Sequence, residues 1–174
     1  GNTSYSLDGS DDYVQTSLSA NFGSSSFTVS FWLYWNNKSA STDYDFLSTL
    51  NSGGWICGYK NNSGEDKLRF WINGSDITGS SVTTGEWVHL AYVRKDDGSC
   101  EIYKNSELVV TGSITGDTDS NSNVNIGRRP DGANYTDGSF SEVRIYNRAL
   151  TSSEVRYLYD VTERGRSITE VKET

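Results

Sequence analysis

This sequence has few of the residues on which several classes of site depend. Its 174 residues include one proline, one histidine and no methionine. The single histidine, His89, excludes a metal site with several histidine ligands and leaves a Ser-His-Asp triad with one candidate base. No apolar run approaches the ~20 residues that a membrane-spanning helix needs, and no stretch resembles a signal peptide. Because the chain starts at Gly1 and contains no methionine, we expect it to be an excised piece of a larger protein.

Basic charge is also in short supply. The 15 Lys and Arg residues are outnumbered by 23 Asp and Glu, which gives a net charge of −8, and both signs are mixed along the chain. Nucleic acids and anionic membranes require a concentrated basic face, so the sequence predicts neither as a partner and predicts no membrane insertion. Cations and neutral sugars stay open as ligands. The two cysteines, Cys57 and Cys100, are compatible with one disulfide or with two buried thiols, and they do not settle the compartment.

Aromatic residues make up 13% of the chain, and Gly, Ser, Asn and Thr are abundant, which is typical of short strands joined by polar turns. Residues 27–35 (FTVSFWLYW) alternate strictly between two faces. A single sheet would leave the apolar face in water, and burying each side chain contributes ~1.5–3 kcal/mol, so a second sheet must cover it. The sequence therefore predicts an all-β fold, a two-sheet antiparallel β-sandwich. The apolar face consists of Phe27, Val29, Phe31, Leu33 and Trp35.

Further strand candidates are separated by clusters of Gly, Asn, Asp and Ser. Their spacing is that of a sandwich or jelly roll, and residues 86–112 read as an antiparallel meander. The candidates are Ser4–Asp8, Tyr13–Thr16, Asp45–Leu50, Trp55–Lys60, Lys67–Ile72, Glu86–Arg94, Ser99–Lys104, Glu107–Gly112, Ser122–Gly127 and Phe140–Asn147.

One short helix is predicted after the last strand. Thr151 and Glu154 fit a capping box, in which each side chain bonds the backbone N–H of the other residue. Val155, Leu158 and Tyr159 follow as a short apolar stripe at helical spacing. We therefore expect one domain over residues 1–160 and a charged tail or linker over residues 161–174, in which residues 167–172 alternate as a weak edge strand.

Four blocks of sequence, residues 7–14 (LDGSDDYV), 27–32 (FTVSFW), 85–91 (GEWVHLA) and 140–150 (FSEVRIYNRAL), carry a family resemblance. They resemble the laminin G-like domains of the concanavalin A-like lectin/glucanase superfamily, which also includes pentraxins. The last block is the most specific, because the family ends with this strand and a capped turn of helix. The resemblance implies a concanavalin A-like jelly roll over nearly the whole chain and a structural role for His89. It does not give a function, because this fold carries lectins, adhesion modules, glycosidases and spacers.

Catalytic carboxylates in the expected pattern are missing. Glycoside hydrolysis needs two carboxylates held ~5–10 Å apart across a cleft. The glucanases that this chain resembles carry Glu-x-Asp-x-x-Glu or Glu-x-Asp-x-Glu on one strand, and no such stretch occurs here. We therefore predict no catalytic residues and no enzyme activity. A glycosidase with an atypical acid pair that involves Asp43 or Asp119 is a third hypothesis.

Calcium is the candidate cofactor, because it binds oxygens from carboxylates, amides and backbone carbonyls. Two segments offer such oxygens: Asp43 with Asp45, and the run that contains Asp117, Asp119 and Asn121. Ordinary turns use the same residue types, so a solvated turn is the alternative at both places.

The family resemblance implies a third ion site. It would be shared between an aspartate near the N-terminal block, such as Asp8, Asp11 or Asp12, and an aspartate in the closing strand. Ser141 stands where that second aspartate is common, which argues against this site here.

Sugar binding requires an aromatic face on which a pyranose ring stacks, rimmed by amide and carboxylate groups. Trp32 and Tyr34 lie on the non-core face of the strand at residues 27–35, and Tyr92 joins them if its strand is a neighbour. A crossing segment that covers Trp32 is the alternative. The best recognition loop is residues 128–137, which combines Arg128, Asn134 and Tyr135.

These observations predict a non-catalytic carbohydrate-recognition or adhesion module of a larger protein, at the outside of a cell or on a virion surface, with calcium as a candidate ion. The expected partner is a glycan or surface polysaccharide. The alternative is a structural head or spacer domain, such as a phage fibre or capsid-decoration module, that contacts other protein chains and no glycan. The sequence names neither the sugar, nor the oligomeric state, nor the parent protein.

Overall fold

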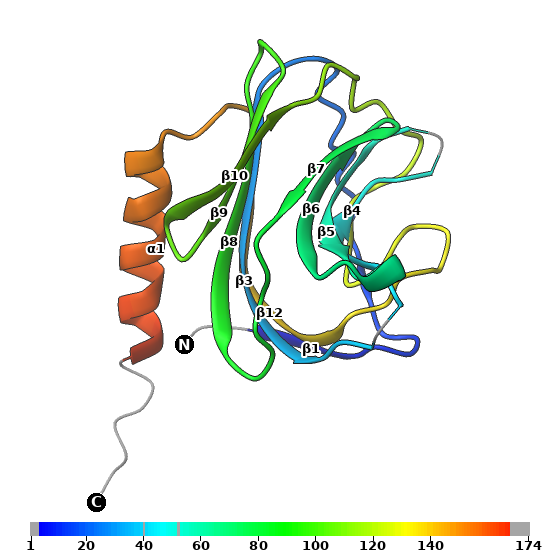
Figure 1. The fold of residues 1–174 in the computed structure, drawn as a ribbon, viewed down its shortest axis with the longest axis vertical. Coiled ribbons are helices and arrows are strands. Elements are labelled where there is room, and N and C mark those ends of the chain that lie inside the picture. Colours follow the sequence, from blue (N-terminus) through cyan, green and yellow to red (C-terminus); the bar gives the residue numbers. More distant parts are fainter. Residues whose placement is uncertain (1–3, 40, 52, 168–174) are drawn as a thin grey trace, which may run out of the picture.

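Two antiparallel sheets of six strands each pack face to face in the computed structural model, which describes residues 4–39, 41–51 and 53–167 (Figure 1). Sheet A contains, in spatial order, β1 (Ser4–Asp8), β12 (Asp137–Tyr146), β3 (Phe27–Asn37), β8 (Trp87–Arg94), β9 (Ser99–Lys104) and β10 (Glu107–Ser113). Sheet B contains β2 (Val14–Gln15), β11 (Asn125–Ile126), β4 (Tyr44–Ser48), β5 (Trp55–Lys60), β6 (Lys67–Ile72) and β7 (Ser75–Gly79), and a 3-10 turn, η1 (Asn62–Gly64), joins β5 to β6. The predicted two-sheet antiparallel sandwich is confirmed.

The core lies between the sheets, where β3 places its apolar face. All five of its large apolar side chains, from Phe27 to Trp35, are fully buried. Phe31 packs against Phe46 of the opposite sheet, with ring centroids 6.1 Å apart. This burial confirms the predicted second layer, since it removes from water the face that a single sheet would leave exposed.

The predicted meander is present as β8, β9 and β10, which follow one another in sheet A. Strand β7 is not among the predicted strands. It pairs with β6 through a tight turn at Asn73 and Gly74, both of which have positive φ. Both cysteines are buried and free, so Cys57 and Cys100 form no disulfide.

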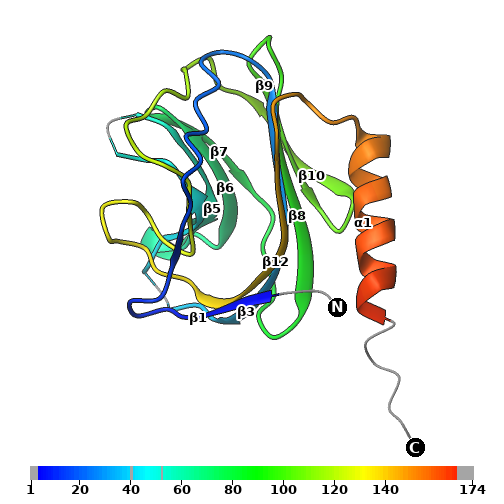
Figure 2. The same ribbon diagram turned by 180° about the vertical axis from the view of Figure 1, so that it is seen from behind.

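Helix α1 (Ser152–Ser167) lies on the outer face of sheet A (Figures 1 and 2). The predicted capping box starts it: the Glu154 N–H donates to Thr151 Oγ1 at 3.2 Å, and the Thr151 N–H donates to Glu154 Oε2 at 2.8 Å. Val155 packs against Ala91 and Val93 of β8.

The helix is longer than expected, because it continues past Asp160 to Ser167 and so includes the first half of the predicted tail. Residues 168–174, which hold the rest of that tail and most of the predicted edge strand, lie outside the described residues. Within the described residues, no helix combines the length and the apolarity required to cross a membrane.

Candidate functional site

A pocket of about 350 Å³ opens where three strands of sheet A end. Asp137, the first residue of β12, pairs with Asp8 at the end of β1 on one side and with Asn37 at the end of β3 on the other. Gly138 permits this close approach, because a Cβ there would lie 2.5 Å from the Tyr34 carbonyl oxygen. We call this site the strand-end pocket; its lining consists of Asp8, Gly9, Asn37, Ser39, Thr42, Tyr44, Asn134, Tyr135 and Asp137.

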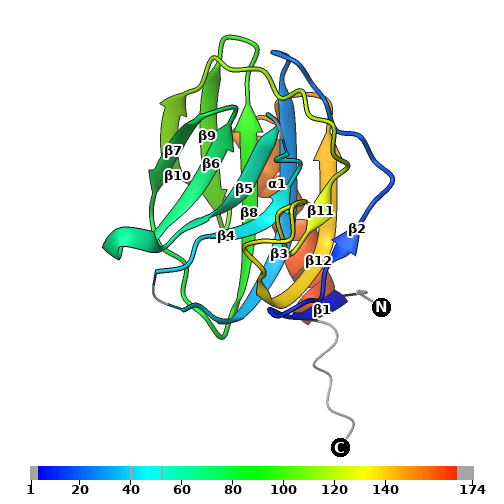
Figure 3. The same ribbon diagram turned by 90° about the vertical axis from the view of Figure 1, so that its right-hand side faces the viewer.

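The second wall of the pocket is a loop over residues 127–136 that crosses the outer face of sheet B (Figure 3). Gly127 begins it with φ +84°, and its N–H donates to the Phe46 carbonyl oxygen at 2.8 Å. At the other end, the Thr136 N–H returns to the Gly127 carbonyl oxygen at 2.8 Å. The loop is therefore closed on itself and attached to β4.

Asp45 of β4 anchors this loop through two hydrogen bonds to Asn134. Its backbone N–H donates to the Asn134 carbonyl oxygen at 3.3 Å, and Asn134 Nδ2 donates to Asp45 Oδ1 at 3.1 Å. Asn134 has φ +59°, a conformation that asparagine tolerates better than most residues. Burial raises the pKa of Asp45 to about 6, although the Asn134 hydrogen bond and the charges of Arg129 and Arg69 act in the opposite direction.

Tyr135 is held in place by Arg128. Arg128 Nη1 donates to the Tyr135 hydroxyl at 3.2 Å, and Nε donates to Asn125 Oδ1 at 3.2 Å. The same guanidinium lies 3.2 Å from the centre of the Tyr13 ring. Arg128, which the sequence predicted as a sugar contact, thus orients a pocket residue and does not line the pocket itself.

The two pocket carboxylates each have one oxygen fixed by the protein. Asp8 Oδ1 accepts from the Ser10 N–H at 2.8 Å, and backbone donors in this turn lower the pKa of Asp8. Asp137 Oδ1 accepts from Asn36 Nδ2 at 2.8 Å. Within the described chain, no hydrogen-bond donor engages the second oxygen of either carboxylate, so each retains acceptor capacity for a ligand.

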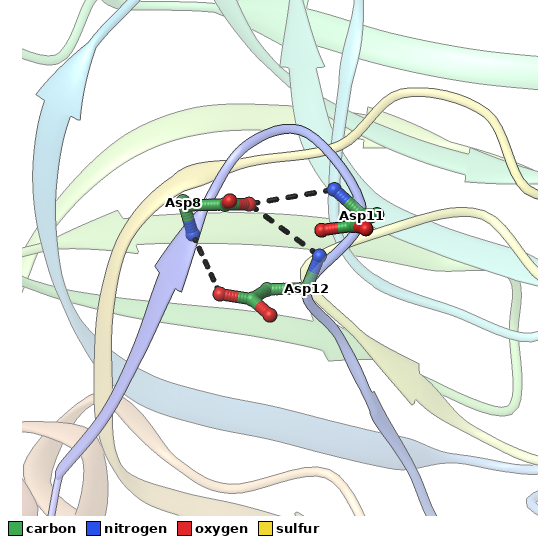
Figure 4. A group of neighbouring side chains, drawn as sticks. All are labelled: Asp8, Asp11 and Asp12. Atoms are coloured by element: carbon green, nitrogen blue, oxygen red, sulfur yellow. Dashed lines mark hydrogen bonds between the residues drawn. The ribbon is translucent and has the colours of Figure 1, made fainter.

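Asp8 also belongs to a cluster of exposed carboxylates with Asp11 and Asp12 (Figure 4). One oxygen from each lies within 4.8 Å of the others, a spacing compatible with a hard cation. Part of this capacity stabilises the turn itself, because Asp12 Oδ2 accepts from the Asp8 N–H at 3.3 Å. Ser141 is not beside this cluster, since it is buried and pairs with Ser4.

The predicted calcium pair of Asp43 and Asp45 does not fit a cation. Asp43 Oδ1 accepts from the backbone of Asn61 at 3.0 Å, and Arg69 Nη1 lies 3.6 Å from Asp43 Oδ2. Asp45 is buried, and the positive charges of Arg129 and Arg69 act on it. Two arginines therefore occupy the electrostatic role that a calcium ion would have.

The second predicted calcium segment lies in the connection between β10 and β11. Asp117, Asp119 and Asn121 are exposed, while the intervening Thr118 and Ser120 are buried. The hydrogen bond among the three is from the Asp119 N–H to Asp117 Oδ1 at 3.3 Å, the pattern of an ordinary turn. Calcium binding there stays a prediction.

Two predicted sugar contacts are corrected by their burial. The Tyr92 side chain is fully buried in the core, where its hydroxyl donates to the Gly58 carbonyl oxygen at 3.2 Å. Trp32 is covered by α1: its ring stacks on Tyr159 with centroids 5.5 Å apart, and Nε1 donates to Thr162 Oγ1 at 2.7 Å. Neither ring has a face free for a sugar.

Tyr34 is half-buried on the outer face of sheet A, where it forms an edge contact with Trp87 at 5.6 Å, and it does not line the pocket. Of the predicted sugar contacts, Asn134 and Tyr135 line the pocket, and Arg128 contacts Tyr135 without lining it. Asp137, the last residue of the predicted recognition loop, also lines the pocket. Sequence reasoning did not place Asp8, Asn37, Ser39 or Thr42 in this site.

A comparison with protein families assigns most of the chain to one family. A family model described as "Concanavalin A-like lectin/glucanases superfamily" matches residues 8–156, which is most of the sequence. A comparison with curated protein sequences finds no match.

Solved structures share the fold at low identity. The binding domain of Paraclostridial Mosquitocidal Protein 1 is 23% identical, with a TM-score of 0.65 over 86% of this chain and 40% of that chain. A heptameric SAP-like pentraxin from Limulus polyphemus is 17% identical, with a TM-score of 0.73 over 90% of this chain and 81% of that chain. A Trypanosoma rangeli sialidase is 20% identical, with a TM-score of 0.60 over 82% of this chain and 24% of that chain. The present chain thus spans less than half of the toxin domain and about a quarter of the sialidase.

Proposed function

Because this chain belongs to the concanavalin A-like lectin/glucanase superfamily, we propose that it is a non-catalytic module that binds a glycan in the strand-end pocket. The observation that carries the proposal is the composition of the lining, which joins two carboxylates, two amides, two aliphatic hydroxyls and two tyrosines. Sugar hydroxyls both donate and accept, and such a mixture of fixed polar groups beside aromatic rings is what orients them. On this proposal the parent protein acts outside the cell or on a virion surface.

Catalysis is not part of the proposal. Asp8 and Asp137 are the carboxylates of the pocket, and they occupy directly paired strand positions. Backbone donors lower the pKa of Asp8, whereas a general acid requires a raised pKa near the working pH. Asp45, whose pKa is raised, is buried beneath Asn134 and does not line the pocket.

Calcium enters the proposal through the family resemblance and the acidic residues. In the described part of the chain, three carboxylates come together only at Asp8, Asp11 and Asp12. An ion at this turn would fix one end of the pocket, because Asp8 lines it. Isothermal titration calorimetry with calcium tests for this ion, and the Asp11→Asn variant is expected to bind calcium more weakly than the wild type.

A glycan array tests the main proposal. The wild-type chain is expected to bind a restricted set of glycans, and Tyr135→Ala and Asn134→Ala are expected to weaken that binding by at least about tenfold, the loss typical of a central contact. Tyr157→Ala is the matched control, since this tyrosine is exposed on α1. Equal binding by wild type and both pocket variants would place the site elsewhere.

The alternative function is a structural module that contacts other protein chains. The outward side of α1 favours it, because Tyr157 is 66% exposed and Val161, one turn further along, is 40% exposed. Two results together would favour this alternative over glycan binding. The correctly folded protein would bind no glycan on the array, and it would capture a protein partner that the Tyr157→Ala variant does not capture.

A further inference from the structure

The charge of the strand-end pocket restricts the glycans that fit it. Among the described residues that line it, the ionisable groups apart from the tyrosines are the carboxylates of Asp8 and Asp137, and no Lys or Arg is present. The Ser10 N–H binds one oxygen of Asp8, and the Asn36 side chain binds one oxygen of Asp137. The pocket therefore presents negative charge and hydrogen-bond acceptors at one end.

Basic side chains near the pocket are already paired with the protein. Arg128 is held by Tyr135 and Tyr13, and Arg129 Nε donates to Asp131 Oδ1 at 2.9 Å. Lys38, next to Asn37 in sequence, is paired with Asp66 and lies over the Tyr59 ring. None of the three lines the pocket.

We propose that the strand-end pocket selects a neutral sugar and rejects sialylated, sulfated and uronic acid glycans, an inference that rests on the proposed function. The ligand is a neutral pyranose with two adjacent hydroxyl groups. These hydroxyls donate to the remaining oxygens of Asp8 and Asp137, which occupy paired positions across β1 and β12.

The remaining lining groups suit the same ligand. The amides of Asn37 and Asn134 both donate and accept, so they match hydroxyl groups in either direction. An acid group lacks protons to donate and brings a like charge beside two carboxylates. Two such repulsions weaken binding by about tenfold or more in a solvent-accessible site, and more at low salt.

Matched glycan pairs test the selection. Biotinylated glycans that end in a neutral hexose, and the same glycans capped with sialic acid or sulfated at the terminal sugar, are compared by biolayer interferometry at low and high salt, each with EDTA and with added calcium, because an ion on Asp8 would offset its charge. The wild-type chain is expected to bind at least one neutral glycan about tenfold or more tightly than its acidic counterpart. This ratio is expected to shrink at high salt.

Two isosteric variants attribute the ratio to the pocket. Asp137→Asn and Asp8→Asn each remove one charge while keeping an acceptor oxygen, and both are expected to bring the neutral-to-acidic ratio down to about threefold or less. Asp160→Asn, on α1, removes the same charge elsewhere and is expected to keep the wild-type ratio. Circular dichroism confirms that each variant is folded.

The outcomes separate this inference from the proposed function. If acidic glycans bind as well as neutral ones, or better, the selection is wrong and glycan binding by the pocket stands. If Asp160→Asn changes the ratio as much as the pocket variants do, the overall charge of the protein is responsible and the pocket is not. If no glycan of either class binds, the proposed function itself fails.

Discussion

Asp45 allows a quantitative test of how the pocket is built. The residue is 1% exposed, and burial raises the pKa of its carboxyl group from 3.8 to about 6. The folded state then holds a proton that the unfolded state releases between about pH 4 and pH 6. The stabilising contribution of Asp45 is therefore fully present below about pH 4 and is lost as the pH rises through about 6.

The size of this effect follows from the two pKa values. A difference of about two units corresponds to about 3 kcal/mol of unfolding free energy, because each unit is worth 1.36 kcal/mol. In an Asp45→Asn variant the side-chain amide cannot ionise, and it keeps an oxygen that accepts from Asn134 Nδ2. The difference in unfolding free energy, wild type minus variant, should fall by about 3 kcal/mol between pH 3.5 and pH 7.

Urea unfolding followed by tryptophan fluorescence, at half-unit pH steps, measures this difference. Glu154→Gln is the control, because hydrogen bonds from Arg148 and Thr151 lower the pKa of Glu154 to about 2. Its stabilising contribution is present above about pH 4.5 and is lost as the pH falls, so its difference curve must have the opposite sign in a lower window. A curve for Asp45→Asn that stays flat from pH 4 to pH 7, or rises, would refute the burial argument and show that Arg129 and Arg69 keep Asp45 ionised.

Three further substitutions test the packing around the site. Phe31→Ala should lower the unfolding free energy by about 3–5 kcal/mol in urea, because the ring is fully buried between the sheets, and a loss below about 1 kcal/mol would contradict that placement. Gly127→Ala should destabilise by about 1–3 kcal/mol, since φ is +84° and the added Cβ would overlap the Leu7 side chain, whereas Gly132→Ala, with φ +85° but only ordinary contacts at 3.8 Å, should cost less in the same assay. Thr162→Val should cost about 1–3 kcal/mol by removing the hydroxyl that accepts from the buried Trp32 indole N–H, and an unchanged thermal midpoint would show that this hydrogen bond does not stabilise the packing of α1.

Local patterns predicted most of the fold, because each depends on neighbours in sequence. Alternation over residues 27–35 gave the buried face of β3, and the Thr151–Glu154 spacing gave the start of α1. Strand β7 was missed although the dipeptide Asn73-Gly74 is a strong hairpin signal, because only Ile77 in that strand is a large apolar residue.

The pocket was only partly predictable, because it depends on register between strands far apart in sequence. Asn134 and Tyr135 were found through the composition of one loop. Asp8, Asn37 and Asp137 come together only because β12 pairs with β1 on one side and β3 on the other. Period-two alternation likewise placed Trp32 on the outer face of β3, but it does not indicate that a helix covers that face.

The cost of burying Asp45 supports the proposal that the strand-end pocket is the functional site. A polar but uncharged residue at this position would avoid a penalty of about 3 kcal/mol at neutral pH, a large part of the stability of a small domain. In this structure the Asp45 carboxylate accepts a hydrogen bond from the Asn134 side chain, and the Asp45 N–H donates to the backbone carbonyl oxygen of Asn134. Together these bonds fix the loop that forms one wall of the strand-end pocket. Departures from the most stable choice concentrate at functional sites, where a fixed geometry is worth more than stability. Asp43, by contrast, is bound at both carboxylate oxygens by neighbouring donors and does not itself line the pocket.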